Sequence, residues 1–150
     1  MNSYWDTSAI LALNIPGDAL HLAAARCWDE LADLPRVWCW VHDLEIPQTV
    51  RNLAQRHPPK GSIDHWRCLI QTLEEDVANG IFLAASISLE DTFQTARLLS
   101  AEYGWANRVG AVDLLHVAAA QKSGCAVFVT GDRQQAGLTQ DAGLKTLLLD

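Results

Sequence analysis

Short apolar runs of strand length recur along this chain, and segments with helical spacing separate them. The runs cover residues 37–41, 81–85 and 125–130, with further strand candidates at 3–5 and 144–149. Continuous apolar runs are typical of strands that are buried on both faces. Strands that alternate with helices form βα units, so the sequence predicts a mainly parallel sheet with helices on both faces.

Helical spacing connects these strand candidates. Thr7 and Ser8 are expected to cap the first helix, because a hydroxyl can satisfy a free N–H of the first turn. Pro47 is compatible with its helix only in the first turn, where the missing N–H costs little. The segment 57–61 contains two prolines and separates two helices, and Ser62 is expected to cap the second of them. Helices are expected over residues 7–13, 18–33, 42–56, 62–79, 88–103, 112–122 and 133–142.

The length of the chain, 150 residues, indicates one domain spanning 1–150. The chain has 11 Lys and Arg against 18 Asp and Glu, which gives a formal net charge of -7. A protein that coats nucleic acid through bulk charge needs many basic residues to neutralise phosphates, so the balance argues against that class. It leaves room for an enzyme that contacts nucleic acid locally.

The cysteines and the N-terminus indicate where the protein resides. No cysteine pair has C-x-x-C spacing, and the cysteines lie within apolar segments, so we expect buried thiols in a reducing compartment. The first residues carry neither a basic nor an apolar stretch, and no apolar run is long enough to span a membrane. We therefore expect a cytoplasmic protein. The cysteines are Cys27, Cys39, Cys68 and Cys125.

Acidic residues follow the predicted strands. Asp6 comes directly after 3–5, Asp132 closely follows 125–130, and Asp113 opens the helix over 112–122. Ligands of parallel sheets gather at the carboxyl ends of the strands, so these carboxylates can converge. Carboxylates that stay ionised together need a cation, and an all-oxygen site favours Mg²⁺ or Mn²⁺.

Two points stay open at this stage. Each of these acids could instead be an ordinary helix cap, which is the commoner role of an Asp after a strand. A further acid near the start of the helix over 42–56 is either Asp43 or Glu45. Residues two apart on a helix point about 200° away from each other, so only one of the two can face the site.

Several segments resemble the signature segments of PIN-domain ribonucleases, and most closely those of VapC-type toxins from toxin–antitoxin pairs. The D-x-x-H-x-A-A pattern that begins at Asp113 is the most specific of them, and order and spacing agree over nearly the whole chain. The segments are residues 4–8 (YWDTS), 41–45 (VHDLE), 112–120 (VDLLHVAAA) and 129–132 (VTGD).

The resemblance implies a three-layer α/β/α fold and an endoribonuclease that uses Mg²⁺ or Mn²⁺. It favours Glu45 over Asp43 as the remaining acid. Asp6 and Asp113 would be the chief metal ligands, and Glu45 and Asp132 would complete the shell and orient the attacking water. The catalytic set that it implies is Asp6, Glu45, Asp113 and Asp132.

The resemblance extends to neighbouring residues. Ser8 and Thr130 match hydroxyls that support the acids, and His116 is expected to pack or form hydrogen bonds rather than to catalyse. Gln48 stands where family members often carry Asn, which is a departure close to Glu45.

An RNA substrate also requires positive contacts near the acids. Arg108, in the loop before Asp113, is the preferred candidate, followed by Arg51 and Arg133; each could equally be a solvated surface charge. The resemblance further implies a homodimer and a small antitoxin protein, one segment of which enters the acidic site.

Two other classes remain as alternatives. The chain could be a PIN-like protein-binding module without turnover, although all the acids are present. It could also be another acidic-pocket α/β protein such as a receiver domain, which carries two adjacent acids where this chain has Asp6 alone. Trp28, Trp38 and Trp40 could form an exposed partner surface, although burial is the more ordinary role of tryptophan.

Overall fold

The computed structural model of the protein describes residues 1–56 and 63–150. The predicted break at 57–61 and the predicted cap at Ser62 lie outside these residues. No helix within the described ranges is long and apolar enough to cross a lipid bilayer.

A five-stranded parallel sheet forms the centre of the fold, with the strand order β3-β2-β1-β4-β5. The chain runs outward from β1 to one edge and then returns to the other side of β1. Ligands of such sheets bind where the strand order reverses, beside the carboxyl ends of β1 and β4. A receiver-type sheet has the order 2-1-3-4-5, so that alternative is excluded. The strands are β1 (Asn2–Trp5), β2 (Arg36–Trp38), β3 (Leu83–Ala84), β4 (Cys125–Thr130) and β5 (Lys145–Leu148).

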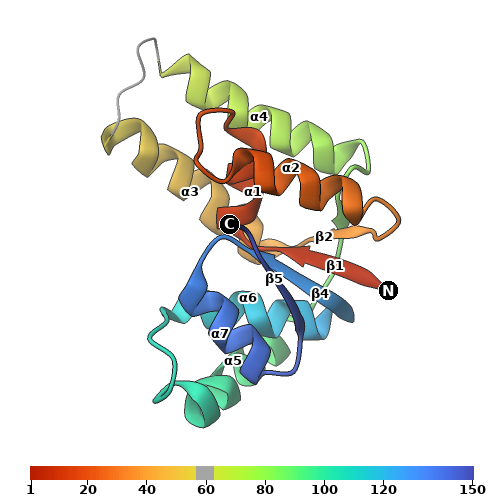
Figure 1. Ribbon diagram of the computed structural model, residues 1–150, viewed down its shortest axis with the longest axis vertical. Coiled ribbons are helices and arrows are strands. Elements are labelled where there is room, and N and C mark those ends of the chain that lie inside the picture. Colours follow the sequence, from red (N-terminus) through yellow and green to blue (C-terminus); the bar gives the residue numbers. More distant parts are fainter. Residues whose placement is uncertain (57–62) are drawn as a thin grey trace.

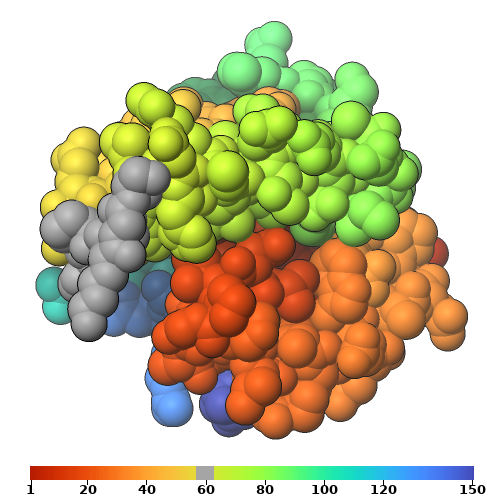
Figure 2. Space-filling model, turned by 90° about the horizontal axis from the view of Figure 1, so that it is seen from above, coloured from red at the N-terminus to blue at the C-terminus, as the bar shows by residue number. Residues whose placement is uncertain are grey.

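Helices cover both faces of this sheet, so the predicted three-layer α/β/α class is confirmed (Figure 1). The first four helices lie on one face, and Figure 2 shows α4 alongside α1 and α2 there. The last three cover the opposite face. The helices are α1 (Thr7–Asn14), α2 (His21–Glu30), α3 (Trp40–Arg56), α4 (Asp64–Ala78), α5 (Leu89–Tyr103), α6 (Ala111–Lys122) and α7 (Arg133–Asp141).

Neighbouring residues of each strand enter different cores, because side chains alternate across a sheet. In β1, Trp5 packs beneath α1 to α4, whereas Tyr4 packs against α5 to α7. Val129 and Phe128 of β4 divide between the two cores in the same way. All four side chains are fully buried. The apolar run of β4 is therefore continuous because both of its sides are covered.

The boundary between β2 and α3 differs from the prediction. The strand ends at Trp38 and the helix begins at Trp40, although the apolar run continues to residue 41. The chain turns at Cys39, whose backbone N–H donates to Nδ1 of His42 over 3.0 Å. Pro47 consequently lies inside α3 rather than in its first turn. It removes the helical hydrogen bond to the carbonyl of Asp43, and Asp43 is exposed to water.

Other deviations concern exposed positions. The strand expected over 81–85 pairs only at Leu83 and Ala84, because its partner β2 is itself short. Cys68 is exposed on α4, whereas the other cysteines are buried as predicted. Trp38 is buried, while Trp28 and Trp40 are partly covered. The tryptophan that stands in solvent is Trp105, with 98% of its surface exposed.

His42 joins α3 to the central strand. Its Nε2–H donates to the carbonyl oxygen of Trp5 over 2.9 Å, and its Nδ1 accepts from Cys39. Burial, and after it the neighbouring His116, lower the pKa of His42 to about 3. The imidazole is therefore neutral in the folded protein at neutral pH.

This arrangement predicts an acid-sensitive fold. The unfolded chain has a His42 pKa near 6.5 and the folded chain one near 3, so the unfolded state binds the extra proton between these values. Stability contributed by His42 is present above pH 6.5 and is lost as pH falls towards 3. Relative to His42→Gln, the wild type should lose at most about 1.4 kcal/mol of unfolding free energy per pH unit. Urea denaturation at pH 7, 6 and 5 measures this difference, and parallel pH profiles would contradict it.

Candidate active site

Asp6 occupies the end of β1 and is the N-cap of α1, so the cap is this carboxylate and not Thr7 or Ser8 as expected. Oδ1 accepts from the Ala9 backbone over 2.9 Å and from the Ser8 hydroxyl over 2.6 Å. Oδ2 accepts from the Thr130 hydroxyl over 2.6 Å. The two hydroxyls thus support the acid from α1 and β4. Asp6 is buried, and burial raises its pKa in spite of these donors.

Glu45 approaches the same point from α3. Its Oε2 accepts hydrogen bonds from the Thr7 hydroxyl and from Nε2 of His116. Burial alone would raise the pKa of Glu45, but the bonds from His116 and Thr7 outweigh it and lower the pKa below its usual value. Asp43 points away and accepts from the Trp38 indole over 2.7 Å. Of the two acids left open by the sequence, Glu45 is the one at the site.

Asp113 and Asp132 each stand at a helix start. Asp113 lies in the first turn of α6, where its Oδ2 accepts from the Gly110 backbone over 2.7 Å. Asp132 is the N-cap of α7 and accepts from the Gln134 backbone over 2.7 Å. The backbone N–H of Asp132 donates to the Thr130 hydroxyl over 2.9 Å, which ties it to the group that holds Asp6.

Gly131 lets the β4–α7 turn pass close to α1. A Cβ atom at this position would lie 2.7 Å from Leu20 Cδ1 and 3.3 Å from Ser8 Oγ. The Gly131 N–H donates to that Ser8 oxygen over 2.8 Å. The absence of a side chain therefore permits the contact that brings Asp132 beside Asp6.

All of these carboxylates line one pocket of about 230 Å³. Burial raises the pKa of Asp113, and the negative charges of Asp132 and Glu45 raise it further. The structure thus brings together the acids that the sequence singled out. The pocket is lined by Asp6, Thr7, Ser8, Leu11, Glu45, Thr49, Asp113, His116 and Asp132.

The chemistry of this donor set suits a hard divalent cation, which prefers carboxylate oxygen. The side chains are nevertheless turned towards protein donors. Over residues 1–56 and 63–150, no group of three or more His, Cys, Asp or Glu is arranged so that it could hold a metal ion. The pocket therefore collects the donors without placing them around one point.

His116 acts as a hydrogen-bonding residue, as expected: it is buried and bridges Tyr4 and Glu45. Thr7, Thr49 and Tyr4 were not anticipated at the site. The signals were weak: Thr7 adjoins Asp6, and Thr49 lies one helical turn after Glu45. Gln48 is exposed and bonds to Asn52, so this departure from the family pattern lies outside the pocket.

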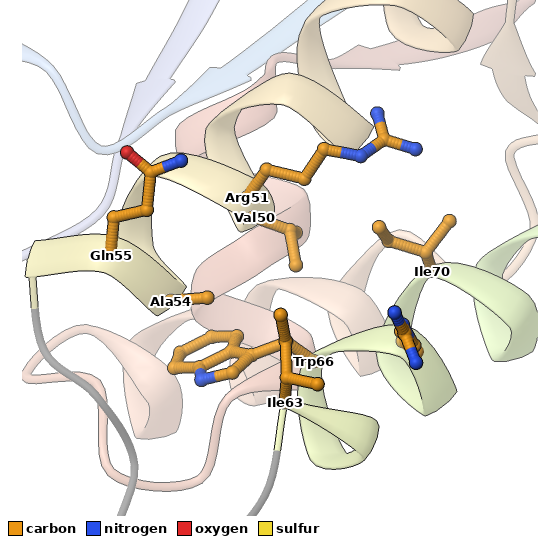
Figure 3. A pocket seen from close by; sticks show the side chains of 8 residues that line it. Val50, Arg51, Ala54, Gln55, Ile63, Trp66 and Ile70 are labelled. Atoms are coloured by element: carbon orange, nitrogen blue, oxygen red, sulfur yellow. The ribbon is translucent and has the colours of Figure 1, made fainter.

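The arginine candidates are exposed, and none of them lines the acidic pocket. Arg108 lies in the loop between α5 and α6, and Arg133 begins α7 beside Asp132. Arg51 borders a different cavity of about 480 Å³ between α3 and α4, together with Trp66 and Arg67 (Figure 3). None of the three arginines therefore enters the acidic pocket.

No family model matches the sequence. No curated protein matches it either. The fold matches the crystal structure of VapC20 from Mycobacterium tuberculosis, a toxin that cleaves the sarcin–ricin loop, with a TM-score of 0.65 and 20% identity over 95% of this chain and 96% of that one. It also matches FitAcB from Neisseria gonorrhoeae, with a TM-score of 0.63 and 16% identity over 97% and 96%. The PIN-like fold is thereby established.

Because the acids lie close together, we expect neutralising one of them to change the free energy of unfolding. Because the pKa of Asp113 is raised in the fold, its ionised form costs folding energy at neutral pH. Asp113→Asn should therefore stabilise the metal-free protein by roughly 1 kcal/mol. Mg²⁺ should stabilise the wild type and should stabilise the variant less. Melting curves with EDTA and with millimolar Mg²⁺ measure both effects.

Asp91 provides a matched control. It occupies the same position in the first turn of α5 as Asp113 does in α6, but it is exposed and outside the pocket. Asp91→Asn should leave the melting temperature nearly unchanged in EDTA and should not alter the response to Mg²⁺. If Asp113→Asn behaves in the same way, Asp113 acts only as a helix-terminus residue.

Proposed function

We propose that this chain is a PIN-domain ribonuclease of the VapC type, the toxin of a toxin–antitoxin pair, which hydrolyses RNA phosphodiester bonds with Mg²⁺ or Mn²⁺. The observation that carries the proposal is the convergence of four carboxylates on one pocket from β1, α3, α6 and the start of α7. The PIN-like fold and the signature segments in the sequence support it.

The carboxylate donors would suit a hard cation: Asp6 and Asp113 would be its chief ligands, and Glu45 and Asp132 would complete the shell, partly through water. Such an ion polarises a phosphate and lowers the pKa of a bound water molecule. The protein prepares the site by fixing Asp6: the bonds from Ser8, Ala9 and Thr130 hold both of its oxygens before any ligand arrives.

Glu45, on α3, and Asp132, just before α7, line the same pocket as this fixed group. The lowered pKa of Glu45 keeps it ionised at neutral pH, so it can accept a hydrogen bond from a water molecule and orient it. Arg108, Arg51 and Arg133 would hold the phosphates that flank the scissile bond, because the pocket itself offers only negative charge and one imidazole.

An antitoxin partner fits the same pocket. The concentration of carboxylates would attract an Arg or Lys side chain from a partner segment, and charge-assisted hydrogen bonds would hold it there. Such a side chain would exclude both the cation and the substrate phosphate. We further propose that the protein is a homodimer.

The alternative is a PIN-like module that binds proteins without turnover. A scaffold of this kind has no need for crowded carboxylates, since burial, and after it the charges of Asp132 and Glu45, raise the pKa of Asp113 and cost stability. The retained acidic pocket therefore favours an enzyme.

Activity gives the direct test. Purified protein should cleave RNA in Mg²⁺ or Mn²⁺ and stop when EDTA is added. Asp6→Asn and Glu45→Gln should each reduce the cleavage rate by roughly 100-fold or more, because a bound divalent ion supplies several kcal/mol of transition-state stabilisation. Arg108→Ala should chiefly raise KM. Initial rates on a fluorogenic RNA measure these changes.

Asp43→Asn is the matched control, because Asp43 lies two residues from Glu45 but bonds to Trp38 outside the pocket. It should cleave RNA as fast as the wild type. Undiminished cleavage in EDTA would refute the metal-dependent mechanism, and equal losses in Asp43→Asn and Glu45→Gln would remove Glu45 from the site.

Assembly gives a second test. Light scattering should show a dimer, and co-expression with the product of a neighbouring gene should give a complex that cleaves no RNA. Replacement of one Arg or Lys of that partner by Ala should restore cleavage. A protein that stays monomeric at high concentration, and that no neighbouring gene product inhibits, would contradict the toxin assignment.

A further inference from the structure

A series of buried polar groups connects the core between the sheet and α5 to α7 with the acidic pocket. Tyr4 is fully buried in β1, and its hydroxyl oxygen lies 2.8 Å from Nδ1 of His116. At the other side of the same ring, Nε2 contacts Oε2 of Glu45. These residues come from β1, α6 and α3, and the function proposed above assigns no task to Tyr4 or His116.

The hydrogen-bonding capacity of the groups determines the direction of the bonds. A carboxylate can only accept, so Nε2 of His116 must carry a proton and donate it to Glu45. When the ring is neutral, Nδ1 is then an acceptor, and the Tyr4 hydroxyl donates to it. The Tyr4 ring is itself fixed, because it stacks on Phe128 with ring centroids 5.3 Å apart and an interplanar angle of 17°.

Only one oxygen of Glu45 is occupied by these bonds. Oε2 accepts from both His116 and Thr7. Oε1 makes no hydrogen bond to any residue within 1–56 or 63–150, and the side chain of Glu45, which lines the acidic pocket, is 28% exposed. The buried donors therefore hold one oxygen and leave the other without a partner among the described residues.

We propose that Tyr4 and His116 are positioning residues: Tyr4 fixes the ring of His116, and His116 fixes Oε2 of Glu45, so that Oε1 is the oxygen offered to a divalent cation. The inference rests on the proposed function in placing Glu45 at a cation site. The proton arrangement within the group stands independently of it. Hydrogen-bond partners behind metal ligands typically change metal affinity by 10- to 100-fold when they are removed.

Manganese binding tests whether Tyr4 acts through Glu45. Tyr4→Phe removes one hydroxyl and keeps the stacked ring, and it should weaken Mn²⁺ binding by roughly 10-fold in calorimetric titrations. In a Glu45→Ala background, the same change should weaken binding less than about 2-fold, because the residue through which Tyr4 acts is gone. An equal loss in both backgrounds would mean that Tyr4→Phe merely loosens the core, and would overturn the proposal.

Two sets of variants separate positioning from packing. Tyr103→Phe removes the other tyrosine hydroxyl, on α5, and should leave Mn²⁺ binding unchanged. His116→Gln keeps an N–H donor near the position of Nε2 and should retain affinity within a few-fold, whereas His116→Leu should lose at least as much as Tyr4→Phe. Equal affinities for the Gln and Leu variants would contradict a role for the donor.

The imidazole nitrogens provide a readout that needs neither metal nor RNA. In ¹⁵N spectra of the metal-free protein, Nε2 of His116 should carry a proton, and in Tyr4→Phe the ring should no longer hold a single state. A wild-type ring protonated at Nδ1 alone would overturn the proposal. If the wild type binds no Mn²⁺ and cleaves no RNA, the proposed function fails, and these spectra still decide whether Tyr4 and His116 hold Glu45.

Discussion

One buried carboxylate, that of Asp6, connects the elements around the acidic pocket. Burying an ionised group costs several kcal/mol unless hydrogen bonds replace its water shell, and Asp6 receives donors on both oxygens. Those donors belong to α1 and β4, so satisfying the charge joins the first helix to the neighbouring strand. The Ser8 and Thr130 hydroxyls then accept from Gly131 and Asp132 and extend the network to the start of α7.

Helix capping and acidic-site chemistry are not competing roles in this protein. Asp6 and Asp132 are N-caps, and Asp113 accepts a backbone N–H in the first turn of α6. Each of the three acids lies at a helix start that follows a strand or a loop at the same edge of the sheet. The free N–H groups of a helix start attract negative charge. The three helix starts thus stabilise carboxylates that would otherwise repel one another.

The sequence was sufficient for the order of elements, the parallel sheet and the acids Asp6, Asp113 and Asp132, because these follow from apolar runs and from residues next to strand ends or helix starts. The choice of Glu45 over Asp43 came from the resemblance to a family. The sequence was not sufficient to place the boundary at Cys39, where one apolar run continues from strand into helix, because buried residues of a strand and of a helix are both apolar. The bridge from Tyr4 to His116 was also beyond reach. It joins residues 112 positions apart, which meet because α6 packs on the face of the sheet into which Tyr4 points.

The tight passage at Gly131 has an evolutionary consequence. A side chain there would collide with Leu20, which lies just before α2, and with the Ser8 hydroxyl that supports Asp6. Ser8 is held by its hydrogen bonds, so Leu20 is the neighbour that can change. Related chains that carry a larger residue at position 131 should carry a smaller one at position 20. The side-chain volumes at positions 131 and 20 are therefore expected to vary together, although one lies beside the acidic pocket and the other in the loop before α2.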